Sequence, residues 1–149
     1  MFVGFIGTYY INIDQKGRLN IPAKFKEILG SKYSNQLILT KFDHSITAYP
    51  AEEWAALEEK RKELPTLKKD VRDYMRLLYS FAAECNLDKQ GRILIPAPLR
   101  ESVSLDGEAA VVGMSNKIEI WNRKMWDSFL SENKEKYEDI AEGLSELGF

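Results

Sequence analysis

Cysteine and histidine are almost absent from this chain of 149 residues, which contains one of each, Cys85 and His44. A single cysteine excludes an intramolecular disulfide, and one cysteine with one histidine argues strongly against a zinc site of the Cys/His type. Apolar runs are short, and none approaches the roughly 18 residues of a membrane-spanning helix. The first residues lack the positive charge and the length of a signal peptide, so we expect a cytoplasmic protein.

Motifs for catalysis are also missing. The sequence has no glycine-rich phosphate loop, no His-Glu-x-x-His helix and no Gly-x-Ser-x-Gly turn. His44 follows Asp43 without a nucleophile beside it and is interpreted as a loop residue, and Cys85 is interpreted as a small buried side chain. Asp14 and Asp88 each begin a turn, a position that aspartate occupies for structural reasons. We therefore expect neither an enzyme nor a cofactor, metal ion or small-molecule substrate.

What the chain does have is an internal repeat. Residues 14–23 read Asp-Gln-Lys-Gly-Arg-Leu-Asn-Ile-Pro-Ala, and residues 88–97 read Asp-Lys-Gln-Gly-Arg-Ile-Leu-Ile-Pro-Ala, 74 positions later. The similarity extends to Trp54 and Trp126, where the offset has fallen to 72. Two copies of a unit this long do not form a solenoid, so we expect two similar half-units that build one symmetric body.

Each copy is predicted to contain two strands, a short helix and two more strands. Alternating polar and apolar residues predict strands over 9–14 and 18–21, with Leu19 and Ile21 facing inward. The turn between these strands has aspartate first and glycine fourth, so Gly17 should adopt the left-handed conformation that closes a hairpin.

The remaining elements follow from the same periodicities. The first helix should cover 23–29 and end at Gly30. Further strands are predicted over 36–41, 45–49, 109–112 and 117–121. Two helices should lie between the copies, the second with an apolar packing stripe that consists of Leu67, Val71, Tyr74, Met75, Leu78, Phe81 and Ala82. Asn122 should cap a helix after the second copy, and helical spacing continues through Tyr137, Ile140, Leu144 and Leu147.

Charge is distributed unevenly, although the net charge is only −2. Residues 1–41 contain six basic and two acidic side chains, a net +4, whereas residues 131–149 contain two basic and six acidic side chains, a net −4. This asymmetry is compatible with ordinary solvated surfaces. It is also the pattern of a basic working face with an acidic tail held elsewhere.

An arginine follows each turn glycine and lies four residues after the turn aspartate: Arg18 after Asp14, and Arg92 after Asp88. One interpretation is a local ion pair that locks the hairpin and contributes about 0–1 kcal/mol if it is exposed. The other is that the turn holds a guanidinium ready for bidentate contact with a phosphate or a guanine. The two interpretations are compatible.

The doubled pattern Asp-x-x-Gly-Arg-[hydrophobic]-x-Ile-Pro resembles the SpoVT/AbrB motif of bacterial transition-state regulators and antitoxins. In combination with other motifs the chain is similar to the MraZ family. These further motifs are the start Met1-Phe2-x-Gly4, the segment Glu84-Cys85-x-Leu87-Asp88 and the segment Asn116-Lys117-x-Glu119-x-Trp121. The resemblance covers essentially the whole chain.

This resemblance implies an α+β fold, namely a double-split β-barrel formed by two pseudo-symmetric ββαββ repeats with flanking helices. The whole of 1–149 would form one domain. Its parts would be a first repeat over 5–50, a helical connection over 51–76, a second repeat over 77–124 and a C-terminal helical tail over 125–149.

The resemblance also implies a function. Members of such a family would be sequence-specific transcriptional regulators that bind short direct repeats of double-stranded DNA in the promoter of the bacterial division and cell-wall gene cluster. They would assemble as homo-oligomeric rings and would be cytoplasmic and nucleoid-associated. The DNA-contacting element of the family falls here on Asp14, Arg18, Asp88 and Arg92, and the neighbouring side chains expected to add phosphate contacts are Lys16 and Lys24.

Two alternatives belong to other classes. The chain could be an oligomeric, antitoxin-like protein-interaction module without DNA readout, with contacts through the barrel and the helices of Trp54 and Trp126. It could also be a small-ligand barrel or an enzyme, which would need a polar pocket that the sequence does not indicate. The second copy is less basic than the first, because Lys16, Asn20 and Lys24 correspond to Gln90, Leu94 and Pro98.

Overall fold

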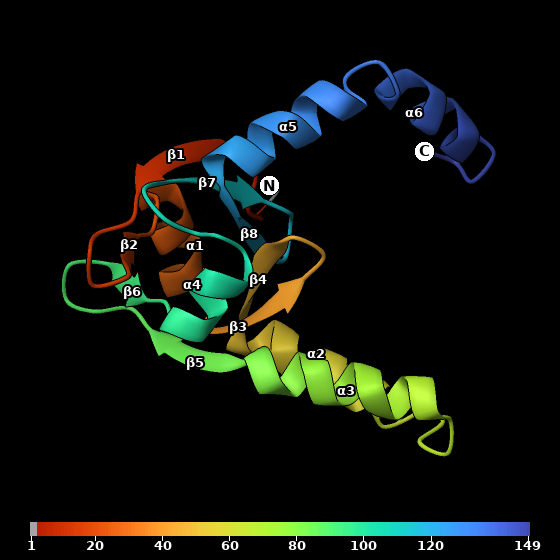
Figure 1. The fold of residues 1–149 in the computed structure, drawn as a ribbon, viewed down its shortest axis with the longest axis horizontal. Helices are drawn as coiled ribbons and strands as arrows, with labels where there is room; N and C mark the ends of the chain where they lie inside the picture. The colour runs from red at the N-terminus through yellow and green to blue at the C-terminus, as the bar shows by residue number, and fades with distance from the viewer. Residues whose placement is uncertain (1–2) are drawn as a thin grey trace.

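Pairs of strands alternate with one or two helices along the chain in the computed structural model, which describes residues 3–149 (Figure 1). Met1-Phe2, part of the family-like start, lies outside the described residues. The strands are β1 (Thr8–Asn12), β2 (Arg18–Asn20), β3 (Gln36–Phe42), β4 (Ser45–Pro50), β5 (Ala83–Asn86), β6 (Arg92–Leu94), β7 (Glu108–Gly113) and β8 (Ile118–Asn122). The helices are α1 (Ala23–Lys32), α2 (Ala51–Arg61), α3 (Lys69–Phe81), α4 (Ala97–Ser102), α5 (Arg123–Asn133) and α6 (Tyr137–Ser145).

The predicted strands are all present, with ends that differ by a few residues. The predicted end of the first helix is wrong, because α1 continues through Gly30 to Lys32. The backbone N–H of Tyr33 still donates to the carbonyl of Leu29, at 3.1 Å, so the helical bonding persists past the glycine. The left-handed residue that follows the helix is Asn35, with φ of 64°.

The two repeats exchange strands. A six-stranded antiparallel sheet has the order β1-β7-β8-β4-β3-β5, so the first strand of each repeat pairs with the third strand of the other. In this register Tyr10 lies opposite Ala110, and Leu37 lies opposite Cys85. β4 and β8 join the two halves at the centre of the sheet. Each repeat therefore depends on strands of the other repeat to form its part of the sheet.

The second strands of the two repeats form a separate antiparallel ribbon, β2 with β6. Figure 1 shows this ribbon at one end of the molecule, beside the loops that follow β1 and β5. Over residues 3–149 the strands thus form one six-stranded sheet and one two-stranded ribbon. The α+β class is confirmed, whereas closure into a double-split barrel stays a prediction.

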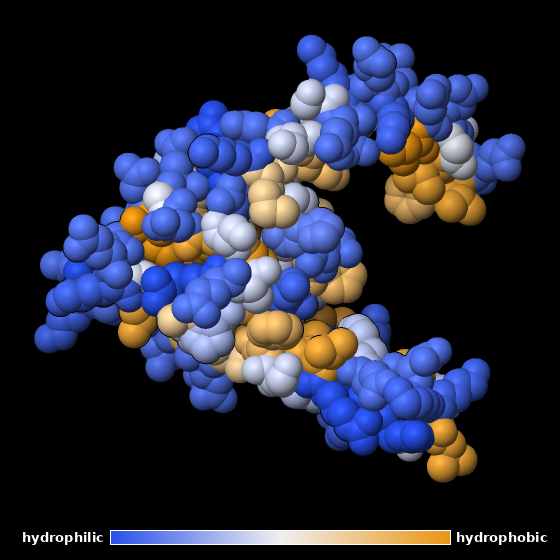
Figure 2. All heavy atoms as spheres, viewed as in Figure 1, coloured by the Kyte–Doolittle hydropathy of each residue, from blue (hydrophilic) through white to orange (hydrophobic). Residues whose placement is uncertain are grey.

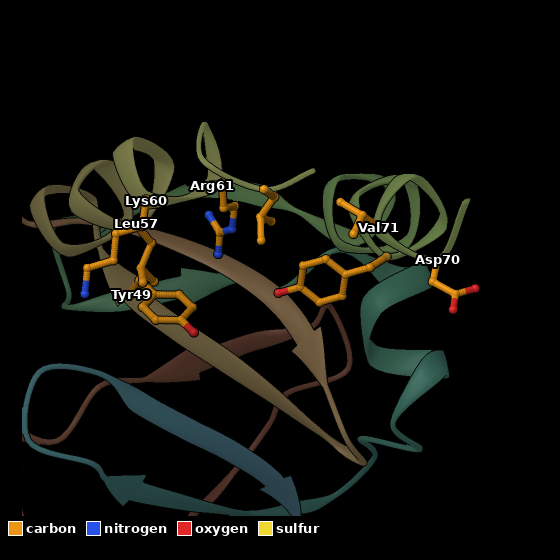
Figure 3. A pocket seen from close by; sticks show the side chains of 8 residues that line it. Tyr49, Leu57, Lys60, Arg61, Asp70 and Val71 are labelled. Carbon is orange, nitrogen blue, oxygen red and sulfur yellow. The ribbon is translucent and has the colours of Figure 1, made fainter. Parts of the chain in front are cut away.

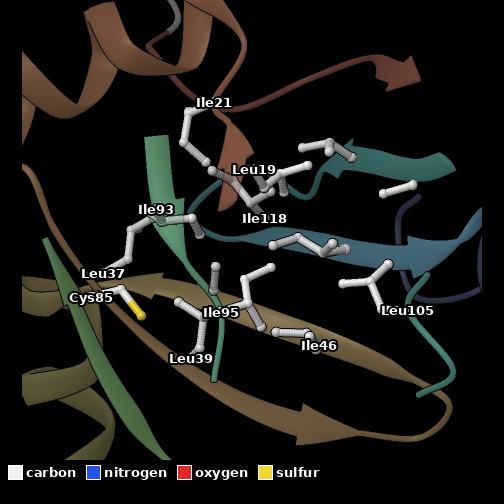
Figure 4. Close-up of a cluster of buried hydrophobic side chains, with 14 of the residues drawn as sticks. Leu19, Ile21, Leu37, Leu39, Ile46, Cys85, Ile93, Ile95, Leu105 and Ile118 are labelled. Atoms are coloured by element: carbon white, nitrogen blue, oxygen red, sulfur yellow. The ribbon is translucent and has the colours of Figure 1, made fainter. Parts of the chain in front are cut away.

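Side chains from both repeats share one hydrophobic core between the sheet, the ribbon and helices α1 and α4 (Figure 4). Leu19 and Ile21 face inward, as predicted, and are at most 2% exposed. Their counterparts Ile93 and Ile95 are buried to the same extent. Cys85 is also buried, as predicted.

Two helical arms leave the core on the side away from the ribbon (Figure 1). One arm is α2 with α3, and the buried hydroxyl of Thr40 in β3 donates to the carbonyl of Leu78 in α3, at 2.8 Å. The other arm is α5 with α6, and the Asn122 side chain caps α5, as predicted, by accepting from two backbone N–H groups. The predicted packing stripe is only partly covered, since Leu67 lies before the start of α3 and is 94% exposed, and Tyr74 within α3 is 43% exposed. Across residues 3–149, every helix is too short or too polar to cross a lipid bilayer.

Two neighbouring substitutions in the ribbon, one at a buried and one at an exposed position, test how much its buried side chains contribute to the stability of the fold. Ile93→Ala should lower the free energy of unfolding by about 2–5 kcal/mol, because it removes a buried side chain from the core shared by both repeats. Leu94→Ala, one residue further, should change it by only about 0.5 kcal/mol, since Leu94 is 58% exposed. Urea denaturation at fixed protein concentration measures both, and equal losses would contradict the packing described.

Candidate nucleic-acid interface

The two turns that carry the predicted site residues have the same backbone geometry. In the first turn the N–H of Gly17 donates to the carbonyl of Asp14, at 3.0 Å, and the glycine has φ of 88°. In the second, Gly91 and Asp88 make the same hydrogen bond at 3.0 Å, with φ of 75°. This left-handed conformation was predicted for Gly17, and glycine adopts it without the steric cost of a Cβ atom.

Each turn aspartate is saturated with hydrogen bonds from its own turn. Oδ1 of Asp14 accepts from the backbone N–H groups of Lys16 and Arg18, both at 2.9 Å. Oδ2 of Asp14 accepts from Nε of Arg18, at 2.6 Å. Asp88 repeats this arrangement with Gln90 and Arg92, and its Oδ2 lies 2.9 Å from Nε of Arg92. The local ion pair is therefore present in both repeats.

These contacts favour the charged form of each carboxyl group. The pKa of Asp14 lies below its ordinary value, first because the backbone N–H of Arg18 donates to it and further because the Arg18 side chain does so. The pKa of Asp88 is lowered in the same way by Arg92. Both turns are therefore fastened by an ionised carboxylate at neutral pH.

The arginines are held but not enclosed. The Arg18 side chain is 33% exposed and the Arg92 side chain 25%. Each aspartate binds the Nε edge of its arginine, which fixes the direction of the guanidinium while part of the group stays accessible to solvent. Arginine arranged in this way retains donors for a phosphate or a base edge.

Strand pairing brings the two arginines onto one face. In the ribbon Arg18 lies opposite Leu94, and Asn20 lies opposite Arg92. Residues directly opposite each other share a face, and the intervening Leu19 and Ile93 point into the core. The two arginines are therefore diagonal neighbours, and their backbone positions are roughly 7–8 Å apart in ordinary sheet geometry.

Each turn is also supported by the other repeat. The carbonyl of Gly17 accepts from the N–H of Ile95, at 2.9 Å, and the carbonyl of Gly91 accepts from the N–H of Ile21, at 3.0 Å. A methyl group added to Gly17 would lie 2.6 Å from the guanidinium carbon of Arg100 in α4. That arginine is held by a bond from its Nε to the carbonyl of Ile95, at 2.9 Å.

The same relation exists at the other turn, where the Lys26 side chain of α1 covers Gly91. Lys26 and Arg100 were not among the predicted site residues, although the structure places both beside the turns. The 74-residue offset was the available signal, because it aligns these two basic residues with each other. The offset could not indicate that each of these side chains lies against the turn of the opposite repeat.

The two predicted lysines lie at the edge of this surface. Lys16 is exposed at the tip of the first turn, and Lys24 is exposed in the first turn of α1. Figure 2 shows hydrophilic residues over the end of the molecule where Figure 1 places both turns. The second repeat has Gln90 and Pro98 at the corresponding positions, so its side of the surface carries fewer cations.

Other kinds of site find less support. Within residues 3–149 no group of three or more His, Cys, Asp or Glu side chains is arranged to hold a metal ion. His44 is exposed between β3 and β4. Burial raises the pKa of the Cys85 thiol to about 11, which keeps it protonated and unreactive.

Comparison with known proteins gives two results. A family model described as MraZ protein, antitoxin-like, matches residues 4–77 and again residues 78–146. The chain is 43% identical over 145 residues to the "Transcriptional regulator MraZ" of Halothermothrix orenii, with 97% of this chain and 99% of that protein covered. It is 45% identical, with the same coverage, to the "Transcriptional regulator MraZ" of Desulfitobacterium hafniense.

The lowered pKa values predict how stability responds to acid. Because the folded carboxyls of Asp14 and Asp88 titrate below their unfolded range, their stabilisation is present at neutral pH and is lost as the pH falls through the lowered pKa. The double variant Asp14→Asn, Asp88→Asn should therefore lose less stability than the unchanged chain between pH 7 and pH 3. Asp73, whose pKa is also lowered, keeps a residual slope in both proteins. Urea denaturation at both pH values tests this, and an identical pH dependence would refute the role given to the turn carboxylates.

Proposed function

Because the chain belongs to the MraZ family, we propose that it is a sequence-specific DNA-binding transcriptional regulator and that the β2–β6 ribbon with its two turns is its DNA contact. The family is one of transcriptional regulators and not of enzymes, which confirms the expectation that this chain is not an enzyme.

One observation carries the proposal: two guanidinium groups, each fixed by a turn carboxylate, share the outer face of one ribbon. The major groove of B-DNA admits a two-stranded ribbon, and arginine is the side chain that most often reads guanine there. Fixing the side chain in advance reduces the entropy lost on binding. In this arrangement Arg18 and Arg92 contact bases or set the register, and Asp14 and Asp88 orient them.

Phosphate contacts come from the surrounding cations. Lys16 and Lys24 lie exposed beside the first turn, and Lys26 and Arg100 lie against the two glycines. Contacts to phosphates position a protein on DNA without reading its sequence. The first repeat supplies more of them than the second, where Pro98 takes the place of Lys24.

The finer features of the proposal follow the family resemblance. The target is a set of short direct repeats in the promoter of the division and cell-wall gene cluster, read in the cytoplasm by a nucleoid-associated ring of copies. The sheet and the ribbon together would be the two parts of a double-split barrel. A net charge of −2 gives a single copy weak attraction to DNA, and linked copies raise the effective concentration of each further contact.

A protein-interaction module of the antitoxin type is the second candidate. It is favoured by the exposed apolar residues of the arms, which include Leu77 and Leu144. A sample that forms a stable complex with another protein and binds no DNA would support it over the regulator.

Arg18→Ala tests base reading. If Arg18 contacts a guanine, the variant should bind the promoter repeats about 1–3 kcal/mol more weakly for each engaged site, roughly 5- to 150-fold. Arg76→Ala, on α3 and 69% exposed, removes the same charge far from the ribbon and should bind normally. Titration by gel shift or fluorescence anisotropy measures both, and unchanged binding by Arg18→Ala would remove that residue from the interface.

Lys24→Ala tests phosphate positioning. The variant should bind all DNA sequences more weakly to a similar degree, and the slope of log K against log salt should become shallower by about 0.9 for each phosphate that Lys24 neutralises. Lys134→Ala, at the far end of α5, serves as the control with an equal change of charge. A changed sequence preference with an unchanged salt slope would contradict the phosphate role.

A further inference from the structure

Helix α6 begins an apolar stripe that no other part of residues 3–149 covers. Its members lie at helical spacing and are 44–74% exposed: Tyr137, Ile140 and Leu144 in the helix, and Leu147 just after its end. All residues from 134 to 149 are exposed, and α6 buries none of its side chains. Isolated helices shorter than roughly 12–15 residues are marginal in water. A helix of nine residues with a bare apolar stripe therefore needs a packing partner.

The opposite arm carries a groove that could supply one. The groove lies between α2, α3 and the end of β4, and its volume is about 480 Å³ (Figure 3). Its apolar wall consists of Tyr49, Leu57, Leu64, Val71 and Tyr74. Beyond Tyr74 it continues into a second hollow of about 330 Å³ that includes Phe42, Leu77 and Phe81. α6 is about 14 Å long at 1.5 Å per residue.

A polar group in the groove also lacks a partner. The Arg61 side chain is 10% exposed, and its guanidinium stacks over Trp54 with a separation of 4.5 Å. Its Nη1 atom lies 3.5 Å from Glu58 and, among the residues described, makes no hydrogen bond. Figure 3 shows the Arg61 side chain directed into the groove, on the side where the ring of Tyr49 lies. A buried donor of this kind favours an occupant that brings an acceptor oxygen.

Charge decides between two ways of covering the stripe. Residues 131–149 carry a net −4, so two α6 helices packed against each other would bring together two strongly acidic segments. The groove lacks such an excess of negative charge, since Lys41, Lys60 and Arg61 are balanced by Asp43, Asp70 and Glu58, which lies 3.5 Å from Arg61. The groove is therefore the more favourable site for an acidic arm.

We propose that α6 of one copy docks its apolar stripe into the α2–α3 groove of a second copy. The two arms of one chain leave the core separately, and α6 does not reach the groove of its own chain (Figure 1). Because the helix and the groove are different surfaces, each copy receives one neighbour and is received by another. Such a heterologous interface closes into a ring when the rotation between copies permits. This inference rests on the ring assembly of the proposed function and assigns the surfaces that form it.

Mass measurement gives the first test. Leu144→Asp places a charge in the stripe and should reduce the assembly toward the 17.2 kDa of a single chain. Ser145→Asp adds the same charge about 100° away around the helix and should leave the assembly intact. Light scattering after size-exclusion chromatography, with circular dichroism to confirm folding, separates the two. A full-sized assembly of Leu144→Asp would overturn the inference.

Cross-linking identifies the partner surface. Ala141→Cys lies beside the stripe and Lys60→Cys lies on the rim of the groove, so both surfaces keep their apolar side chains. With a short bismaleimide the double variant should give a ladder of linked chains, and each single variant should give none. Cys85 is buried with a raised thiol pKa and provides an unreactive background.

Every other cross-linking result opposes the inference. Linked dimers of the Ala141→Cys variant alone would show helices paired with each other, and an internal link in the double variant would show α6 folded onto its own chain. An absence of links would show that the two surfaces do not meet.

The ring and the DNA contact are judged separately. If the unchanged chain is a large assembly that Leu144→Asp does not dissociate, the docking surfaces are wrong and the ring stands. If the unchanged chain has the mass of one copy, the ring of the proposed function fails as well. Binding of the unchanged chain to the promoter repeats then decides whether the regulator role survives.

Discussion

Strands β2 and β6 hold each other in place through main-chain hydrogen bonds that neither repeat can make alone. Each is only three residues long, so its position depends on its partner and on the buried side chains Leu19 and Ile93 beneath it. The bonds from Ile21 to Gly91 and from Ile95 to Gly17 extend this dependence into the turns. The direction of each arginine is therefore set as much by the opposite repeat as by its own.

The arginine side chains of this ribbon are preorganised by several weak contacts that act together. A single exposed ion pair contributes little, but here the same carboxylate also accepts two backbone N–H groups and fixes the turn around its glycine. The side chains of Lys26 and Arg100 close over those glycines from the other half. The result is a cationic surface built on main-chain geometry, separated by the core from the arms (Figure 1).

Much of this could be predicted from the sequence, because the turn pattern and the strand alternation are local signals. The left-handed Gly17 and the inward Leu19 followed directly from residue type and spacing. The exchange of strands could not be predicted, since each repeat by itself allows pairing within the repeat or across it. Lys26 and Arg100 were missed for that reason. The end of the first helix was wrongly predicted at Gly30, because the sequence alone does not distinguish a glycine within a helix from one that ends it.

Duplication within one chain also gives the ribbon a polarity. Two identical chains would form a surface unchanged by a half rotation, and such a surface matches a palindrome. Here Lys24 of one half corresponds to Pro98 of the other, and Asn20 corresponds to Leu94, so the two ends of the ribbon differ. A partner molecule bound along it would therefore be held in one orientation. A row of such ribbons in the same orientation would match binding sites that all point in the same direction along the partner molecule.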